Sequence, residues 1–454
     1  MHIKVKKGLD VPIKGKPEGA ILSFSSRPTQ LSLNLSSFET VRFSLFKKVG
    51  DTVKIGEPLC EDKSTPGRFF VSPAAGTITE IRRGLKRRLM DIVINVADKE
   101  EHFTFPKRNP LDVSREELIQ HLMEGGIFSK ITQRPFGFLA NPNQTPRSIF
   151  VKALESAPFF PPAEMQVEGY EKEFQTGLDV LKKLTDGNVH LIYRHDTTCA
   201  AFFNAEHAKG HTAEGPHPVA NASLHIQEID PIQTSDDVVW TLNAHDVVSI
   251  GTLLLRGHTH TERVVSIAGP GIIEGQTGFF RLREGFPIAP LIASRIPKNP
   301  CRLISGDPLM GTTTSAEGFL GPNDFVFTVV PENTHREMLH FFRLGVNKYS
   351  FSRAYVSGHL DNSTREYDFT TSMHGEHRAY VDASLYNKVM PLKVPTMHLV
   401  KSVLAEDYDL AEQLGLLEVA PEDFALPTFV DPSKTEMVDI IRQGLRAHAK
   451  ELLE

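Results

Sequence analysis

A succession of short strand patterns and glycine turns over the first hundred residues is the feature that most narrows the possible folds. Apolar and polar residues alternate in Val41–Leu45 and again in Met90–Val96, as they do in half-buried strands. Between these segments Gly50 and Gly56 mark two tight turns, and the strand pattern Thr77–Ile81 follows a further turn. Short strands joined by tight turns predict a small β domain over residues 1–100.

This pattern resembles the barrel-sandwich hybrid of biotinyl and lipoyl domains. Lys63, in Glu61-Asp62-Lys63, resembles a lipoylation site. Its distance from Gly50 is shorter than is usual in such domains, and Ser64-Thr65-Pro66-Gly67 follows it in place of a symmetric hairpin. A plain surface lysine is therefore the favoured interpretation, and a lipoyl-type carrier at Lys63 is the alternative.

Length and composition set further limits. The chain has 454 residues, 40% hydrophobic and 23% charged, so about three globular domains are expected. A formal net charge of −6 does not favour nucleic acid binding. No apolar run approaches the ~20 residues that cross a bilayer, and the first residues lack the apolar centre of a signal peptide. The three cysteines lie far apart, which suits a reducing compartment.

Helix and strand patterns alternate in the next part of the chain. Ser114 forms a capping box with the glutamate three residues later, at the start of a helix that Gly125 ends. A second helix, Glu171–Leu184, has apolar residues at helical spacing. Ser148–Ala153 and Asn188–Tyr193 are strand-like. This order predicts an α/β unit with a partly parallel sheet.

A compact β unit begins at about Arg263, with strand patterns at Val264–Gly269 and Gly278–Leu282. A loop rich in glycine, serine and threonine, Ser305–Gly318, follows it. The last sixty residues have helical patterns, and Ser433 with the glutamate three residues later is expected to cap the final helix.

Several short segments, none specific by itself, carry a resemblance through their order and spacing. They are Lys7-Gly8-Leu9-Asp10, Gly215-Pro216-His217-Pro218, Val239-Trp240-Thr241-Leu242-Asn243, Arg263-Val264-Val265-Ser266-Ile267-Ala268-Gly269-Pro270, Val389-Met390-Pro391-Leu392 and Leu414-Gly415-Leu416-Leu417-Glu418. Over essentially its whole length the chain resembles the A subunits of the sodium-translocating NADH:quinone oxidoreductases.

The resemblance implies an α+β multidomain fold in four parts. These are a barrel-sandwich hybrid over residues 1–100, a Rossmann-like α/β domain without an intact FMN loop over 101–257, a β-grasp unit of the SLBB type over 258–312, and a C-terminal helical bundle without iron–sulfur cysteines over 313–454.

The same resemblance implies a role within a complex. The complex would be a Na+-transporting NADH:ubiquinone reductase of six subunits, with FMN, FAD, riboflavin and iron–sulfur centres in the partner subunits. This chain would be a peripheral subunit on the cytoplasmic face of the bacterial inner membrane, docked mainly on the membrane-embedded B subunit and contributing to the ubiquinone site. By itself it would be neither catalytic nor cofactor-binding.

The absence of cofactor-binding residues is informative because the family is related to the flavin-binding subunit of complex I and to the C subunit of the Rnf complex. Flavin-binding relatives hold a phosphate in a glycine-rich loop after the first helix, whereas here Gly125-Gly126 is followed by bulky Ile127, Phe128 and Ile131. An iron–sulfur cluster needs several thiolates at short spacing, and no cysteine follows Cys301. An Rnf-type electron-transfer subunit is the alternative.

Two proline-fixed aromatic loops supply the candidate contacts with a quinone or with another subunit. The candidates are Arg134, Phe136, Phe138, Phe159 and Phe160. Aromatic side chains in rigid loops suit such contacts, but they could equally fill a vacated flavin pocket.

Other candidates carry weaker signals. His258 and His260 could bind a metal together, but no nearby cysteine or carboxylate cluster completes a tetrahedral set, and Asp246 and Glu262 are the nearest acids. His195-Asp196 do not form a nucleophile–base arrangement. The basic hairpin of Arg82, Arg83, Lys86, Arg87 and Arg88 suits anionic headgroups, an acidic partner or solvent. Tyr349–Arg353 could be a surface for membrane subunits or a plain connector.

Overall fold

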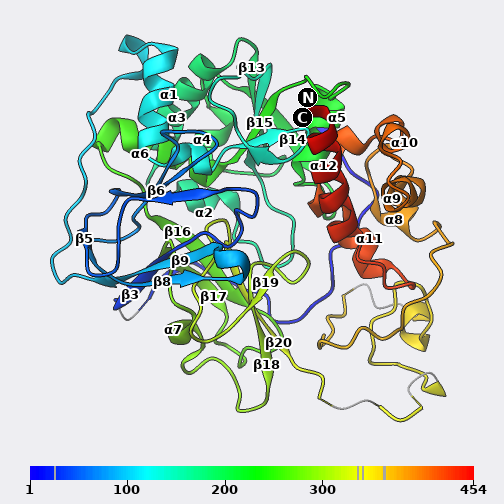
Figure 1. Ribbon diagram of the computed structural model, residues 1–454. Helices are drawn as coiled ribbons and strands as arrows, with labels where there is room; N and C mark the ends of the chain where they lie inside the picture. The colour runs from blue at the N-terminus through cyan, green and yellow to red at the C-terminus, as the bar shows by residue number, and fades with distance from the viewer. Residues whose placement is uncertain (25–26, 335–336, 340–341, 361–363, 454) are drawn as a thin grey trace.

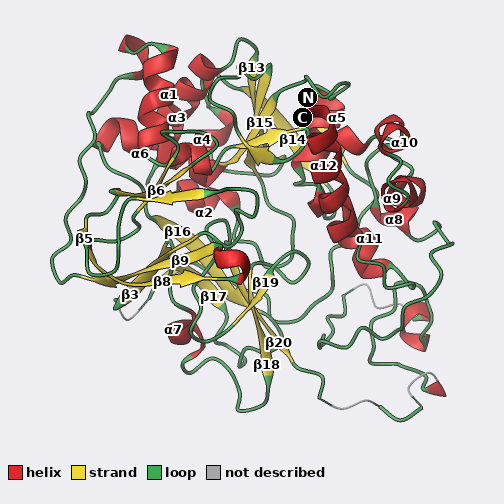
Figure 2. Ribbon diagram, in the orientation of Figure 1, coloured by secondary structure: helices red, strands yellow, loops and turns green. Residues whose placement is uncertain are grey.

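The computed structural model describes residues 1–24, 27–334, 337–339, 342–360 and 364–453. Within these ranges the strands form four sheets, and the buried apolar side chains form three cores (Figures 1 and 2). No helix in the described ranges combines the length and the apolar character needed to span a bilayer.

Two small antiparallel sheets build the N-terminal unit. One has the strand order β3 (Gln30–Asn34), β9 (Leu89–Val96), β8 (Gly76–Arg83) and β5 (Thr52–Val53); the other has β4 (Phe43–Leu45), β6 (Pro58–Asp62) and β7 (Phe69–Val71). The turns predicted at Gly50 and Gly56 are confirmed, because both glycines have positive φ angles, 95° and 83°, and flank β5.

A seven-stranded sheet forms the centre of the molecule. Its order is β1 (His2–Lys4), β14 (Lys209–Glu214), β13 (Asn188–Arg194), β12 (Ser148–Ala153), β15 (Val239–Asn243), β10 (Thr132–Arg134) and β11 (Phe138–Leu139). The strands from β1 to β15 are parallel, and β10 and β11 are antiparallel to their neighbours. The partly parallel sheet expected from the sequence is therefore present.

Helices cover both faces of this sheet. They are α1 (Arg115–Glu124), α2 (Ala163–Val167), α3 (Glu171–Leu184), α4 (Ala200–Phe203), α5 (Ala222–Ile229) and α6 (Ala244–Arg256). Alternate residues of β12 point to opposite faces: Ile149 and Val151 lie in the core with α1, α3 and α6, and Phe150 lies in the core that contains α5. The predicted capping box is confirmed, with Ser114 as the N-cap of α1, and α3 has the predicted bounds.

Helices α3 and α6 cross at two glycines. A Cβ atom built on Gly251 of α6 would lie 1.8 Å from the carbonyl oxygen of Glu173 in α3. A Cβ on Gly177 of α3 would lie 2.2 Å from the carbonyl oxygen of Val247 in α6. Only glycine permits this approach of two backbones, so the pair fixes how the helices pack over the sheet.

A six-stranded mixed sheet lies against the N-terminal unit and shares a core with it. Its order is β19 (Thr312–Thr314), β18 (Cys301–Ser305), β20 (Val326–Pro331), β16 (Glu262–Ala268), β17 (Gly278–Arg283) and β2 (Ile21–Ser23), and α7 (Ile288–Ile292) packs beside it. Strand β20 follows residue 312, in the range for which the sequence suggested helices, because it pairs in parallel with β16.

The first twenty-three residues run along both large sheets. Strand β1 pairs with β14, where Ile3 lies opposite Ala213, and β2 pairs with β17, where Leu22 lies opposite Phe280. The start of the chain thus joins elements that lie more than two hundred residues away in the sequence.

Among the described residues, five α-helices follow residue 385 and pack on the α5 side of the seven-stranded sheet. They are α8 (Tyr386–Val389), α9 (Thr396–Leu404), α10 (Tyr408–Gln413), α11 (Ala425–Val430) and α12 (Met437–Leu453). The expectation that Ser433 caps the last helix is wrong. Its hydroxyl donates to the Ala379 carbonyl, and Asp431 organises the turn before α12 by accepting from the amides of Ser433 and Thr435.

We predict that Gly251→Ala lowers the free energy of unfolding by about 1–3 kcal/mol, because the added methyl forces α6 away from α3. Alanine has the higher helix propensity by about 1 kcal/mol, so a stabilised variant would show that the helices separate without penalty. Urea unfolding measures the difference, and Lys172→Ala, at an exposed position of α3, is the control.

Candidate functional site

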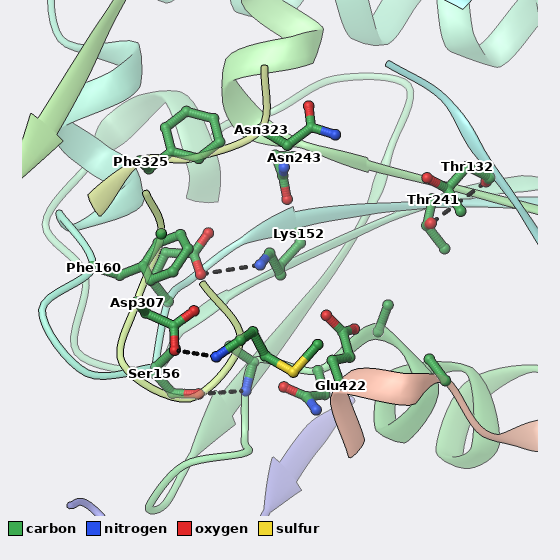
Figure 3. A pocket seen from close by; sticks show the side chains of 18 of the residues that line it. Thr132, Lys152, Ser156, Phe160, Thr241, Asn243, Asp307, Asn323, Phe325 and Glu422 are labelled. Atoms are coloured by element: carbon green, nitrogen blue, oxygen red, sulfur yellow. Dashed lines mark hydrogen bonds and ion pairs between the residues drawn. The ribbon is translucent and has the colours of Figure 1, made fainter. Parts of the chain in front are cut away.

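A cavity of about 560 Å³ lies at the carboxyl ends of β12 and β15 (Figure 3). The ends of parallel strands are where α/β sheets usually bind ligands. We call it the strand-end cavity. The loop between β18 and β20 and residues 420–422 close it from the other side. Its lining includes Lys130, Thr132, Arg134, Lys152, Glu155, Ser156, Phe160, His217, Asn221, His225, Thr241, Asn243, Asp246, Asp307, Met310, Asn323, Asp324, Phe325, Glu422 and Arg442.

Lys152, near the end of β12, carries the central cation. Its Nζ donates to Glu155 Oε2 at 3.0 Å and lies 5.7 Å from the centre of the Phe160 ring. Burial opposes the charged ammonium, but the neighbouring carboxylates outweigh it and leave the pKa of Lys152 above its ordinary value. Lys152 is therefore held as an ion pair inside the cavity.

Carboxylates outnumber cations in this cavity, with five against four among its lining residues. Asp246, the third residue of α6, accepts from the amide of the N-cap residue Asn243, and burial raises the pKa of Asp246. Asp307 accepts from the amides of Leu309 and Met310 and is only 6% exposed, and its burial raises its pKa to about 6. Figure 3 shows Lys152, Asp307 and Glu422 reaching this space from three different segments.

Arg134 is buried and holds three segments together. Its Nη1 donates to the Ser223 hydroxyl at 2.8 Å and its Nε to the Pro135 carbonyl, while Nη2 is buried without a hydrogen-bond partner. The carboxylate of Asp423 lies nearby and is itself fixed by Asn221 at 2.8 Å. Arg134 thus serves contacts within the chain.

The five predicted contact residues do not converge. Arg134 and Phe160 line the strand-end cavity, whereas Phe159 is 6% exposed and packs in the core. The rings of Phe136 and Phe138 stack with their centres 6.0 Å apart, and Phe136 also lies 6.2 Å from the ring of His448 in α12. The strand-end cavity stays open beside Phe160, so these phenylalanines do not fill it.

The loop after α1 is used for packing. A Cβ on Gly125 would meet Leu253 at 2.3 Å, and one on Gly126 would meet Val71 at 2.9 Å. Ile127, Phe128 and Ile131 are buried in the core rather than pointed at the cavity.

The other predicted candidates lie apart from this site. Lys63 is exposed in the turn between β6 and β7. His258 lies beside His102, with ring centres 4.7 Å apart, whereas His260 lies beside Tyr170. Among the described residues no group of three or more histidine, cysteine or acidic side chains is placed to hold a metal ion.

His195 and Asp196 lie at the surface. His195 Nδ1 lies 3.9 Å from Asp196 Oδ1, and His195 Nε2 lies 3.4 Å from Glu214 Oε2. The His195 side chain is 45% exposed and the Asp196 side chain 62% exposed.

A second cavity, of about 460 Å³, is bordered by aromatic rings, and we call it the aromatic cavity. Tyr349 lies 5.6 Å from Phe369 and 6.0 Å from Phe429, ring centre to ring centre. Thr428 Oγ1 is buried there without a partner, and burial lowers the pKa of Lys434. The predicted segment Tyr349–Arg353 therefore contributes to a cavity, with rings from two other segments.

Two descriptions of protein families match parts of this chain. The family description "NqrA N-terminal barrel-sandwich hybrid domain" matches residues 3–97, and "NqrA second alpha/beta domain" matches residues 113–259. The A subunit of the Na(+)-translocating NADH-quinone reductase of Chlamydia caviae is 36% identical over 99% of this chain and 97% of its own length. The corresponding proteins of Chlamydia pneumoniae and Rhodopirellula baltica are 35% and 34% identical, over 99% of this chain and 98% of their own lengths.

This chain belongs to the NqrA family. The predicted family and the barrel-sandwich hybrid at the start of the chain are thereby confirmed. Among solved structures, an NAD+-reducing [NiFe]-hydrogenase matches with a TM-score of 0.40 and 11% identity over 75% of this chain and 64% of its own, which is too distant to support an argument.

The cavity residues that the sequence analysis missed had weak signals. Lys152 and Asn243 are polar residues at or next to the carboxyl ends of mostly apolar strands, a position that favours ligand contact in parallel sheets. Asp307 lies in the predicted loop Ser305–Gly318. Glu422 had no local signal, because only the packing of the C-terminal helices brings it to the cavity.

We predict that Asp307→Asn stabilises the protein in a pH-dependent way. The amide keeps an oxygen for the two backbone donors, and it removes a buried carboxylate whose pKa is raised to about 6 from about 4 in the unfolded chain. The free energy of unfolding of the wild type should fall by up to about 3 kcal/mol relative to that of the variant as the pH rises from 4 through 6 to 7.5. Urea unfolding of both proteins across this range measures it, and a pH-independent difference would contradict it.

Proposed function

We propose that this chain is a peripheral subunit of a sodium-pumping NADH:ubiquinone oxidoreductase, docked on the cytoplasmic side of the membrane subunits, chiefly the B subunit. In this proposal the flavins and iron–sulfur centres belong to partner subunits, and this chain catalyses no step by itself. Family membership over 99% of the chain supports it, since the relatives are named as one subunit of such a reductase.

The strand-end cavity does not fit a flavin phosphate. A bound phosphate needs backbone amides or cations directed at it, and this cavity presents more carboxylates than cations. Gly125 and Gly126 would allow a phosphate to approach the backbone closely, but Leu253 and Val71 fill the space beside them. Lys152 is already neutralised by Glu155. These contacts support a subunit that retains the α/β architecture and holds no flavin.

We therefore predict that the purified chain is colourless and does not bind FMN. Added FMN should keep its full fluorescence in the presence of folded protein, as it does with the heat-unfolded chain as control. Absorption spectroscopy and fluorescence titration measure this. Stoichiometric FMN recovered from the protein would contradict the proposal and favour the Rnf-type alternative.

A contribution to the quinone site is the second part of the proposal. The aromatic cavity supports it best, because a planar ring can stack on Tyr349 and Phe429 while its carbonyl oxygens accept from Thr428 and Lys434. Thr428 Oγ1 is buried in the described structure without a hydrogen-bond partner. Of the residues expected from sequence, the stacked Phe136 and Phe138 remain candidates for contact with a partner subunit.

In the assembled complex, Phe429→Ala should raise the KM for quinone about 3–10-fold and leave the KM for NADH unchanged, because one stacking ring is lost. Phe429→Leu keeps most of the side-chain volume and separates stacking from folding defects. Phe203→Ala removes a phenylalanine that is 52% exposed on α4 and is the control. If the complex with Phe429→Ala reduces quinone with an unchanged KM for quinone, the aromatic cavity is not part of the quinone site.

Lys63 keeps the lipoyl-type alternative open to test, since it is exposed at a hairpin turn of the barrel-sandwich unit. The buried ion pair between Arg68 and Asp62, at 2.9 Å, fixes this turn, and Arg68 also donates to the Ala140 carbonyl of the α/β unit. A carrier lysine needs a turn that is free to visit other sites, so this anchoring disfavours the alternative. Intact mass spectrometry of the native chain measures the modification directly.

A further inference from the structure

The hairpin between β8 and β9 projects a short basic turn, which is the light-blue turn beside these strands in Figure 1. The turn is the 3-10 segment Leu85–Arg87 and is closed by a hydrogen bond from the Gly84 amide to the Arg88 carbonyl. Lys86 and Arg87 have positive φ angles of 54° and 63°. We call Arg83, Leu85, Lys86 and Arg87 the basic tip.

Leu85 is the most exposed large apolar side chain of the described residues, at 93%. An aliphatic side chain held at the end of a hydrogen-bonded turn has no neighbours of its own chain to cover it. Transfer of such a side chain out of water is favourable. The geometry therefore presents Leu85 to a surface outside this chain.

Cations surround this leucine, and they differ in how they are held. At the base of the hairpin, Arg82 pairs with Glu80 at 2.9 Å and Arg88 donates to the Ser36 carbonyl. At the tip, Arg83 donates only to the Arg87 carbonyl, and the side chains of Lys86 and Arg87 have no hydrogen bond or ion pair in the described structure. No acidic residue lies between Arg82 and Met90. The charges at the base serve this chain, and those at the tip are free for a partner.

One apolar side chain among three unpaired cations fits an anionic lipid surface. Headgroups attract the cations, and the leucine reaches the boundary of the acyl chains. A protein partner fits less well, because a stable protein interface covers about 800 Å² on each side, and a single protruding turn offers much less. The local charge also stands out in a chain whose net charge is −6.

We propose that the basic tip binds anionic phospholipid at the membrane surface and so fixes the orientation of this chain toward the bilayer. This inference rests on the proposed position of the chain at the membrane, and it adds a direct lipid contact to the contacts with membrane subunits.

The test is co-sedimentation of the full chain with vesicles. Vesicles of phosphatidylcholine with one-third phosphatidylglycerol should bind the chain, and vesicles of phosphatidylcholine alone should not. Each cation near an anionic surface changes the partition coefficient about fivefold. The triple variant Arg83→Gln/Lys86→Gln/Arg87→Gln should therefore bind the anionic vesicles about 100-fold more weakly than wild type. Leu85→Ser should weaken binding to the anionic vesicles about tenfold. This difference should persist at high salt, where the contribution of the cations is screened.

The control removes three exposed cations elsewhere, as Lys6→Gln/Lys7→Gln/Lys99→Gln. An equal loss in the control, or no loss in the tip variants, overturns the lipid contact. If the tip variants bind vesicles normally but bind detergent-solubilised membrane subunits less tightly, the tip contacts protein and the inference is wrong. Wild-type chain that fails to bind the membrane subunits at all would instead overturn the proposed function.

Discussion

The arrangement of the molecule depends on the Gln166 side chain, which forms hydrogen bonds with the backbone of strand β16 as a neighbouring strand would. The amide of Gln166 in α2 donates to the Val264 carbonyl at 2.8 Å and accepts from the Val264 amide at 3.0 Å. Beside it, the Ser266 hydroxyl donates to the Phe159 carbonyl at 2.6 Å. These buried bonds attach strand β16 of the six-stranded sheet to the α/β unit. Buried polar groups must be paired, so sliding one unit against the other would leave several unsatisfied.

The strand-end cavity is a consequence of this attachment. The six-stranded sheet carries the loop that contains Asp307 and the segment that contains Phe325, and the attachment at Val264 holds both over the ends of β12 and β15. Inside, the pair of Lys152 and Glu155 adds little net stability compared with apolar packing, whereas removal of one partner would cost about 3–5 kcal/mol. The pair therefore specifies the arrangement of the cavity more than it stabilises the fold.

Local features of the fold were predictable from the sequence, and features that join distant segments were not. The capping box at Ser114 and the apolar periodicity of Glu171–Leu184 are local signals, and the structure has both elements as predicted. The pairing of β1 with β14 has no local signal, because a three-residue strand is indistinguishable from a loop until its partner is known. The cap expected at Ser433 was wrong for the same reason, since Tyr386, from a distant helix, helps to hold Asp431 in the turn.

The candidate sites show the same limit more strongly. The sequence places aromatic residues in two proline-fixed loops, but exposure decides what they do, and exposure is a property of the packed chain. Phe159 and Phe160 are adjacent, yet one is buried in a core and the other borders a cavity, because the positive φ of 70° at Phe159 turns the chain between them. Tyr349, Phe369 and Phe429 are eighty residues apart at the extremes and form one aromatic wall. Loss of a glycine loop can be read from a sequence, whereas a surface that recognises a new partner is assembled from residues that only the fold brings together.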